Sequence, residues 1–393
     1  MALVNSSSFT STNKTIRTVT LPGNAYVLSL ASLPSHYAAS SSAPTNAIHL
    51  FDKSNLRRVS TLPGHDDAIS CLKSVSGISG TSREVLVSAG RDAVIKVWDE
   101  RTGSAGLKMN ALSSGKGRAL LSCDVSPDGL TVAAGTDLQG DDAAILYWDP
   151  RNPASPLRAH TSTHSDDITA VQFLRSVGHG QNVLLSASTD GLVCTSNPDE
   201  EDEDEAGLRV GNWGCSIAQA GWVHGRSGTP GIWASSDMET FSTWSGELDL
   251  IQDSDIRKPS IQRQDLTWVT DYVIGCHNNS VIPEDRDNDL SIFLGSNEGD
   301  IALVTRSTFG KTDVPWTMER LWRTNHVGVV RSVLWDERNN ILLTGGEDSK
   351  LNAWSYPARE SSSDQVKVKR EGDGDDMDID KEDRSPTRKK KRT

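Results

Sequence analysis

The sequence lacks the apolar segments that would direct it into a membrane. No run of roughly 18 apolar residues, the length that a membrane helix needs, occurs in its 393 residues. The first residues, MALVNSSSFTSTNK, are polar and contain no apolar centre of a signal peptide. We therefore expect no signal peptide and no contact with a membrane.

Cysteine and positive charge are also scarce. The 53 acidic residues outnumber the 40 basic ones, and the net charge of −13 argues against direct nucleic-acid binding. The cysteines form no C-x-x-C pair, which favours reduced thiols in a cytosolic or nuclear protein. They are Cys71, Cys123, Cys194, Cys215 and Cys276. Since no metal-ligand spacing, phosphate loop or nucleotide fingerprint is present either, we expect no metal and no cofactor.

Helical periodicity is weak before residue 356, and a repeat of short strands takes its place. Each copy has an apolar strand, a turn rich in Ser, Gly and Asp, and a second strand that ends in an aromatic and a polar residue. Copies end at residues 52, 99, 149, 197 and 245, at spacings of 47, 50, 48 and 48. The last clear copy ends at residue 355, which leaves room for one more between.

Seven such units predict an all-β fold, a seven-bladed β-propeller over residues 15–356. The stretch TIRTVTL at 15–21 has no repeat of its own, so we expect it to complete the last blade as its outer strand. Residues 1–14 are expected to be a flexible N-terminus. Residues 357–393, poor in apolar side chains and rich in both charges, are expected to be a disordered tail.

Three units carry His, Ser or Thr, and Asp at matching positions, which invites a catalytic-triad interpretation. An active site is built once and needs an exposed nucleophile, whereas this set recurs with Thr in place of Ser, so we interpret it as structural. The sets are His65, Ser88, Asp92 and Trp98; His164, Ser186 and Asp190, with Ser196 at the Trp position; and His326, Thr344, Asp348 and Trp354.

The chain resembles the WD-repeat family in GHDDAIS…LVSAGRDAVIKVWD and in NHVGVVRSVLWDERNNILLTGGEDSKLNAWS. The resemblance implies that each set above is a hydrogen-bonded tetrad, running from Asp to His to Ser or Thr to the Trp indole. A kelch propeller is the alternative, but its Gly-Gly pairs are missing except at Gly345-Gly346. The acidic insert in VAAGTDLQGDDAAILYWDPRNP, residues 132–153, is similar to the group of WD repeat-containing protein 89 and its fungal relatives. That group has no established enzymatic activity.

Two neighbouring units end in a W-D-x-R box, which resembles the docking motif in substrate receptors of cullin-4 ubiquitin ligases. The resemblance implies docking on the ligase adaptor through Asp99, Arg101, Asp149 and Arg151. The alternative is that Trp-Asp followed by Arg is an ordinary turn of this fold.

Two charged runs complete the pattern. The run DEEDEDE, 199–205, is interpreted as a solvated mobile loop, or alternatively as a contact for basic proteins. Basic clusters in the tail predict nuclear import, although the chain could also occupy the cytoplasm. They comprise Lys367, Lys369, Arg370, Arg388, Lys389, Lys390, Lys391 and Arg392.

We therefore predict a non-catalytic nuclear scaffold for protein–protein or peptide interactions. The alternatives are a ubiquitin-ligase substrate receptor and an adaptor in ribosome assembly or chromatin. The sequence does not identify the partner.

Overall fold

Short strands make up nearly all of the regular secondary structure of residues 3–356 in the computed structural model of the chain. Within this range the structure describes every residue except 114–115, 176–181, 227, 263–265, 281, 283, 285, 288–289, 308–310 and 312–313. The tail, 357–393, with its expected disorder and import signal, lies outside the described residues.

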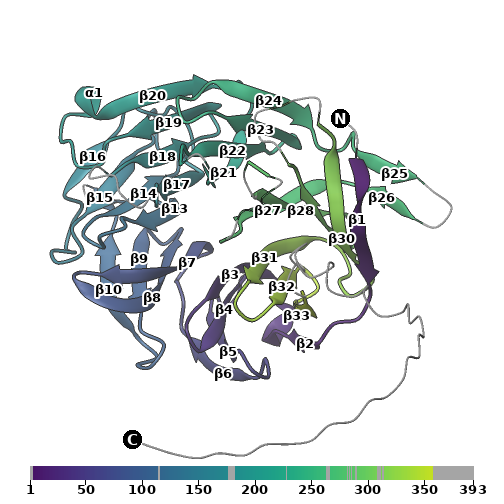
Figure 1. The fold of residues 1–393 in the computed structure, drawn as a ribbon. Helices are drawn as coiled ribbons and strands as arrows, with labels where there is room; N and C mark the ends of the chain where they lie inside the picture. Colours follow the sequence, from purple (N-terminus) through teal and green to yellow (C-terminus); the bar gives the residue numbers. More distant parts are fainter. Residues whose placement is uncertain are drawn as a thin grey trace, which may run out of the picture. The chain divides into compact units, whose positions relative to one another are not determined.

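The strands form seven antiparallel blades in chain order, and Figure 1 shows them arranged as a ring. Blade 1 contains β3 (Val27–Ser32), β4 (His36–Ser41), β5 (Ile48–Asp52) and β6 (Arg58–Leu62). Blade 2 contains β7 (Ile69–Ile78), β8 (Thr81–Gly90), β9 (Val94–Trp98) and β10 (Ala105–Asn110). Blade 3 contains β13 (Leu120–Val125), β14 (Val132–Thr136), β15 (Ile145–Trp148) and β16 (Arg158–His160). Blade 4 contains β17 (Ala170–Phe173), β18 (Leu184–Ala187), β19 (Leu192–Ser196) and β20 (Gly207–Asn212).

The remaining blades follow the same plan. Blade 5 contains β21 (Ile217–Val223), β22 (Gly231–Ser236), β23 (Thr240–Trp244) and β24 (Leu250–Asp255). Blade 6 contains β27 (Tyr272–Asn278), β28 (Leu290–Gly295), β29 (Ile301–Thr305) and β30 (Trp316–Trp322). Blade 7 contains β31 (Val330–Asp336), β32 (Ile341–Gly346) and β33 (Lys350–Ser355). Two small hairpins join blades: β11 (Leu112–Ser113) with β12 (Lys116–Gly117), and β25 (Ser260–Gln262) with β26 (Thr267–Val269).

The N-terminal strand β2 (Arg17–Thr20) completes blade 7, as the sequence predicts. It pairs antiparallel with β33, from Arg17 opposite Ala353 to Thr20 opposite Lys350. The last blade is thus built from both ends of the propeller segment, and the free edge of β33 is covered.

Residues 1–14 were expected to be flexible, but most of them form a strand. Residues Leu3–Thr12 form β1, which pairs in parallel with the outer strand of blade 6, β30. Leu3 and Phe9 pack against the apolar cluster between blades 5 and 6. Two partly buried apolar side chains and the open edge of β30 thus order a segment that is mostly Ser and Thr.

The apolar core is divided among the seven junctions between blades. In the described part of the chain, seven buried clusters occur, and each one joins two neighbouring blades. Fully buried tryptophans end the third strands of blades 2, 3, 5 and 7: Trp98, Trp148, Trp244 and Trp354. Because every sheet buries both faces, the strands are apolar on both sides rather than strictly alternating.

Polar contacts also cross every junction, so neighbouring blades are held by hydrogen bonds or ion pairs as well as by apolar packing. In order around the ring, the contacts join His36 Nδ1 to Glu100 Oε2 (2.8 Å), Lys73 Nζ to Asp124 Oδ1 (3.7 Å), Arg175 Nη2 to Asp124 Oδ1 (2.9 Å), Trp222 N to Gln172 Oε1 (3.0 Å), Asn278 Nδ2 to the Trp222 carbonyl (2.7 Å), His277 Nε2 to Glu337 Oε1 (2.7 Å) and Tyr37 Oη to Asp336 Oδ2 (3.0 Å).

Successive turns of a blade lie at opposite ends of its strands, which gives the ring two faces. We call the face with the turns between second and third strands the tetrad face, because Asp92, Asp190 and Asp348 lie in those turns. The turns between third and fourth strands lie on the other face, the W-D-x-R face.

Candidate interaction site

The predicted set in blade 2 forms one continuous chain of hydrogen bonds. His65 Nδ1 lies 2.8 Å from Asp92 Oδ1, and His65 Nε2 lies 2.7 Å from Ser88 Oγ. The Trp98 indole donates to the same hydroxyl at 2.9 Å. Burial acts to raise the pKa of Asp92, but the hydrogen bond and charge interaction with His65, the Asp66 N–H and the Lys96 charge together lower it below its usual value.

Blade 7 repeats this geometry with Thr in place of Ser. His326 Nδ1 lies 3.0 Å from Asp348 Oδ1, and Nε2 lies 2.8 Å from Thr344 Oγ1, which accepts from the Trp354 indole at 3.0 Å. Burial opposes ionisation of Asp348, yet its hydrogen bond and charge interaction with His326, together with the Val327 and Lys350 N–H groups, bring its pKa down to about 2.

Blade 4 carries the shorter version. His164 lies 3.2 Å from Asp190 through Nδ1 and 2.9 Å from Ser186 through Nε2. Ser196 stands where the indole donor would be, so the chain of hydrogen bonds ends at Ser186.

The burial of these sets decides between structure and catalysis at these positions. Ser88 and Thr344 are completely buried, and each hydroxyl is already engaged by a histidine and an indole. A substrate cannot reach an oxygen held in this way, which a nucleophile would require. The three sets therefore fix the turns of the tetrad face rather than perform chemistry.

One sequence signal for the tetrads was missed, a glycine two residues before the Asp. A Cβ atom on Gly90 would lie 2.5 Å from His65 Nδ1 and 2.7 Å from Asp92 Oδ1. On Gly346 it would lie 2.8 Å from His326 Nδ1. The close approach of the histidine to the strand therefore requires glycine at these two positions.

The two W-D-x-R boxes adopt one geometry on the W-D-x-R face. Arg101 forms a two-point ion pair with Asp99, with Nη2 to Oδ2 at 2.6 Å, and Arg151 does the same with Asp149 at 2.7 Å. Hydrogen bonds from each arginine bring the pKa of both aspartates down to about 2. Both arginine side chains remain about 60 % exposed, at 60 % and 61 %.

A similar pair shows that the geometry does not depend on the tryptophan. Arg257 Nε lies 3.0 Å from Asp255 Oδ1, again two residues apart, in the turn after β24. Asp-x-Arg is therefore a recurrent turn in this chain, and the boxes alone do not identify a docking motif.

The acidic run 199–205 is more ordered than the interpretation as a mobile loop allows. Its end forms α1 (Glu203–Ala206), and the Glu203 carboxylate accepts three backbone N–H groups, of Thr161, Ser162 and Thr163, each at 2.8 Å. Burial opposes ionisation of Glu203, but the Thr163 hydroxyl together with the Thr161 and Ser162 N–H groups lowers its pKa. The segment is thus anchored to the turn after β16, while its other acidic side chains stay largely exposed.

A polar pocket opens on the tetrad face where blades 5, 6 and 7 meet. Its cavity volume is about 310 Å³. We call it the blade 5–7 pocket, and its lining includes Gln219, Asp237, Glu239, Tyr272, Val273, Asn297, Val329 and Arg331. Burial, reinforced by nearby Asp271 and Asp237, raises the pKa of Glu239.

The groups of this pocket differ in how firmly they are held. Tyr272 accepts a hydrogen bond from the Val330 N–H at 2.7 Å, and Arg331 Nε donates to Glu347 at 2.8 Å. No hydrogen bond within the described structure engages the side chains of Gln219, Asp237 or Asn297. The pocket therefore offers amide and carboxylate groups, beside apolar Val273 and Val329, that a partner can use.

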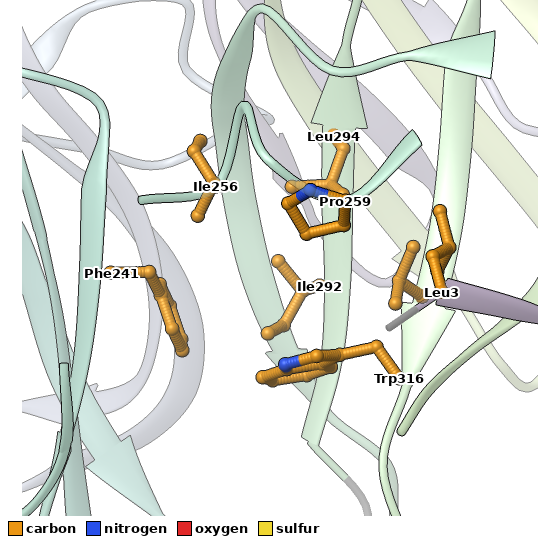
Figure 2. A pocket seen from close by; sticks show the side chains of 8 residues that line it. Leu3, Phe241, Ile256, Pro259, Ile292, Leu294 and Trp316 are labelled. Atoms are coloured by element: carbon orange, nitrogen blue, oxygen red, sulfur yellow. The ribbon is translucent and has the colours of Figure 1, made fainter. Parts of the chain in front are cut away.

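A second pocket, at the rim between blades 5 and 6, is small and apolar. Figure 2 shows Phe241, Ile256 and Ile292 around it, with Leu3 of β1 at one side. Its cavity volume is about 20 Å³, close to that of one water probe. It is a packing gap under the N-terminal strand rather than a ligand site.

The described residues also set limits on other kinds of site. Within them, no helix has the length and apolarity of a membrane span. Nor do three His, Cys, Asp or Glu side chains gather anywhere in the same ranges as they would around a metal ion.

Comparison with known proteins agrees with the repeat and its tetrads. The family model "WD domain, G-beta repeat" matches residues 56–99 and 319–355, the two segments with complete tetrads. The chain is thus similar to the WD-repeat family and carries that family's repeat in these two segments. It is 28 % identical over 360 residues to the WD repeat-containing protein 89 homolog of Dictyostelium discoideum, covering 90 % of this chain and 89 % of that protein.

Other WD-repeat proteins align over most of the chain as well. Identity is 27 % to WD repeat-containing protein GTS1 of Arabidopsis thaliana, covering 84 % of this chain and 81 % of that protein. The crystal structure of the computationally designed Ika8 protein superposes with a TM-score of 0.58 at 16 % identity. It covers 86 % of this chain and 98 % of Ika8, which supports the fold alone. WD-repeat propellers are typically non-catalytic scaffolds for protein–protein interaction, and this chain has their architecture.

Proposed function

We propose that this WD-repeat protein is a nuclear scaffold that binds protein segments in the blade 5–7 pocket and catalyses no reaction. The observation that carries the proposal is the set of side chains without hydrogen-bond partners in that pocket, those of Gln219, Asp237 and Asn297. Asp237 and Asn297 are exposed and Gln219 is half-buried, so all three side chains are free to bind a peptide, while Val273 and Val329 contact its apolar parts.

The decisive experiment is quantitative affinity purification from nuclear extract. A pocket variant, Gln219→Ala/Asp237→Ala/Asn297→Ala, removes the three side chains without breaking any hydrogen bond of the described fold. Arg101→Ala/Arg151→Ala, on the W-D-x-R face, is the control. We expect the pocket variant to recover its principal partners in at least fivefold lower amounts than the wild type. The control should recover them in wild-type amounts. Equal recovery by the pocket variant and the wild type would refute the proposal.

Adaptor docking for a cullin-4 ubiquitin ligase is a second candidate. The observation in its favour is that Arg101 and Arg151 project from neighbouring blades in the same ion-paired geometry and are largely exposed. The same two variants test it with the roles reversed. Loss of the ligase adaptor from Arg101→Ala/Arg151→Ala alone would support docking, and its recovery at wild-type level would end this candidate.

The acidic segment 199–205 lies on the W-D-x-R face too, and its exposed carboxylates would suit a basic partner such as a histone or ribosomal protein. Replacing Asp199, Glu201, Asp204 and Glu205 with the matching amides spares the anchoring Glu203. Salt-sensitive capture of basic proteins should fall with this variant. Whether those proteins belong to chromatin or to ribosome assembly would distinguish these two pathways.

Nuclear residence is proposed from the basic clusters of the tail. A reporter fused to residues 357–393 should accumulate in nuclei, and replacing Arg388–Arg392 with alanine should release it to the cytoplasm. A reporter that stays cytoplasmic would remove the tail as the import signal.

A further inference from the structure

Two cysteines meet at the junction between blades 2 and 3. Cys71 lies on β7 and Cys123 on β13, and both pack in the apolar cluster that joins these blades. Cys71 Sγ is 3.5 Å from the Cys123 carbonyl oxygen. Cys71 is partly exposed, whereas Cys123 is completely buried.

Strand geometry explains why the thiols share one junction. Next to Cys123 on β13, Ser122 bonds to the Ile168 carbonyl and Asp124 to the Phe173 N–H, both toward blade 4. Because successive side chains of a strand alternate, Cys123 turns the other way, toward blade 2. Next to Cys71 on β7, Leu72 packs toward blade 1, which leaves Cys71 facing blade 3.

The surroundings shift the pKa values of the two thiols in opposite directions. A hydrogen bond with the Cys123 thiol lowers the pKa of Cys71 against the effect of burial, and the nearby Lys73 ammonium lowers it further. The opposite holds for Cys123, whose pKa is raised well above its usual value by that contact and by burial. Asp124, 3.7 Å from Lys73 and paired with Arg175, acts in the other direction on Cys71. Cys71 is thus the more acidic thiol of the pair.

We propose that Cys71 and Cys123 are a peroxide-sensitive thiol pair that forms a disulfide between blades 2 and 3. The Cys71 thiolate attacks one oxygen of a hydroperoxide, so an S–O bond forms, the O–O bond breaks, and the leaving oxygen takes up a proton as water or an alcohol. The Cys123 sulfur then attacks the Cys71 sulfenic acid. The S–S bond forms, the S–O bond breaks, and water leaves with the Cys123 proton. Two electrons pass from the thiols to the peroxide.

Other cysteines lack this combination. Burial raises the pKa of Cys194 to about 12 and raises that of Cys276, which keeps both as unreactive thiols. The remaining cysteine, Cys215, is partly exposed but lies on the turn before β21, away from Lys73. It therefore serves as the internal reference for exposure alone.

The test uses the reduced, folded full chain and hydrogen peroxide as the probe. After brief exposure, free thiols are blocked with an alkylating reagent, and the protein is digested without reduction and mapped by mass spectrometry. We expect the Cys71–Cys123 linked peptide to be the main product and Cys71 to react at least tenfold faster than Cys215. Equal reaction rates of Cys71 and Cys215, or oxidation of Cys71 without the linked peptide, would overturn the proposal.

Variants separate the two steps. Cys123→Ser should leave a sulfenic acid on Cys71 that dimedone captures, whereas Cys194→Ser should give the linked peptide as the wild type does. Lys73→Gln should slow the first step severalfold. The mapping of the wild type alone decides the outcome even where a variant folds poorly, and the result does not depend on the proposed binding function.

Discussion

Tyr37 of blade 1 donates a hydrogen bond of 3.0 Å to Asp336 of blade 7, across the junction where the ring closes. Lys53, also from blade 1, reaches the same carboxylate oxygen at 3.1 Å. Burial opposes ionisation of Asp336, but hydrogen bonds from Asn339, Lys53 and Tyr37 outweigh it and lower the pKa. One buried carboxylate therefore joins the first and last complete blades of the ring.

Removing that carboxylate should weaken ring closure. Asp336→Ala leaves a buried hydroxyl and an ammonium group without their acceptor, so we expect a loss of about 1–3 kcal/mol in the free energy of unfolding. Urea denaturation measures it. The control is Glu298→Ala, which removes an exposed carboxylate from the tetrad face. A loss no greater than that of the control would contradict this role of Asp336.

The tetrads should also stabilise the fold, because each of them pairs buried polar groups with one another. Asp92→Ala leaves His65 with an unpaired ring nitrogen in a buried site, so the free energy of unfolding should fall by about 1–3 kcal/mol. Asp66→Ala removes the same charge from an exposed neighbouring position and should have little effect. Thermal melts of the two variants measure the difference. Identical melting temperatures would contradict the tetrad assignment.

The features that the sequence predicts well are those whose cause is local. The interval of four residues from Ser88 to Asp92, and of six from Asp92 to Trp98, lies within one hairpin. Its recurrence in other units, together with the resemblance to WD-repeat proteins, made the tetrad predictable. The closing strand β2 was predictable because blade 7 visibly lacks a fourth strand.

Features that depend on distant partners could not be predicted. Nothing in LVNSSSFTST indicates a strand, because its order comes from the open edge of β30, some three hundred residues later. Glu203 looks like one of many acidic residues until Thr161–Thr163 present three N–H groups to it. The blade 5–7 pocket is similar, since its lining comes from three blades with no shared motif.

The junction between blades 6 and 7 should make stability depend on pH. Burial opposes ionisation of Glu337, but its hydrogen bonds with His277 and Ser280 bring its pKa to about 2. A carboxyl group with a depressed folded-state pKa stabilises the fold above its unfolded-state value, near 4.5, and loses this contribution as the pH falls toward 2. We therefore expect stability to decrease with acidification over this window.

Glu337→Gln tests that contribution. At pH 7 the variant should be less stable than the wild type by about 1–2 kcal/mol, and the difference should shrink toward zero near pH 2. Denaturant titrations at several pH values measure it. The side chain is partly exposed, at 27 %, so salt should reduce the effect. A difference that stays constant with pH would show that Glu337 acts by packing rather than by charge.

The close approach of histidine to strand β8 predicts a cost for adding a single methyl group. In Gly90→Ala, the new Cβ would overlap His65 and Asp92, whose ring and carboxylate are fixed by the tetrad, so a loss of about 1–3 kcal/mol is expected. Gly106→Ala provides a matched control in the same blade, because no atom lies within 4 Å of its Cβ position. Its effect should be near neutral or slightly stabilising. Melting curves that rank Gly106→Ala as the more damaging variant would show that the tetrad can move away from the strand at little cost.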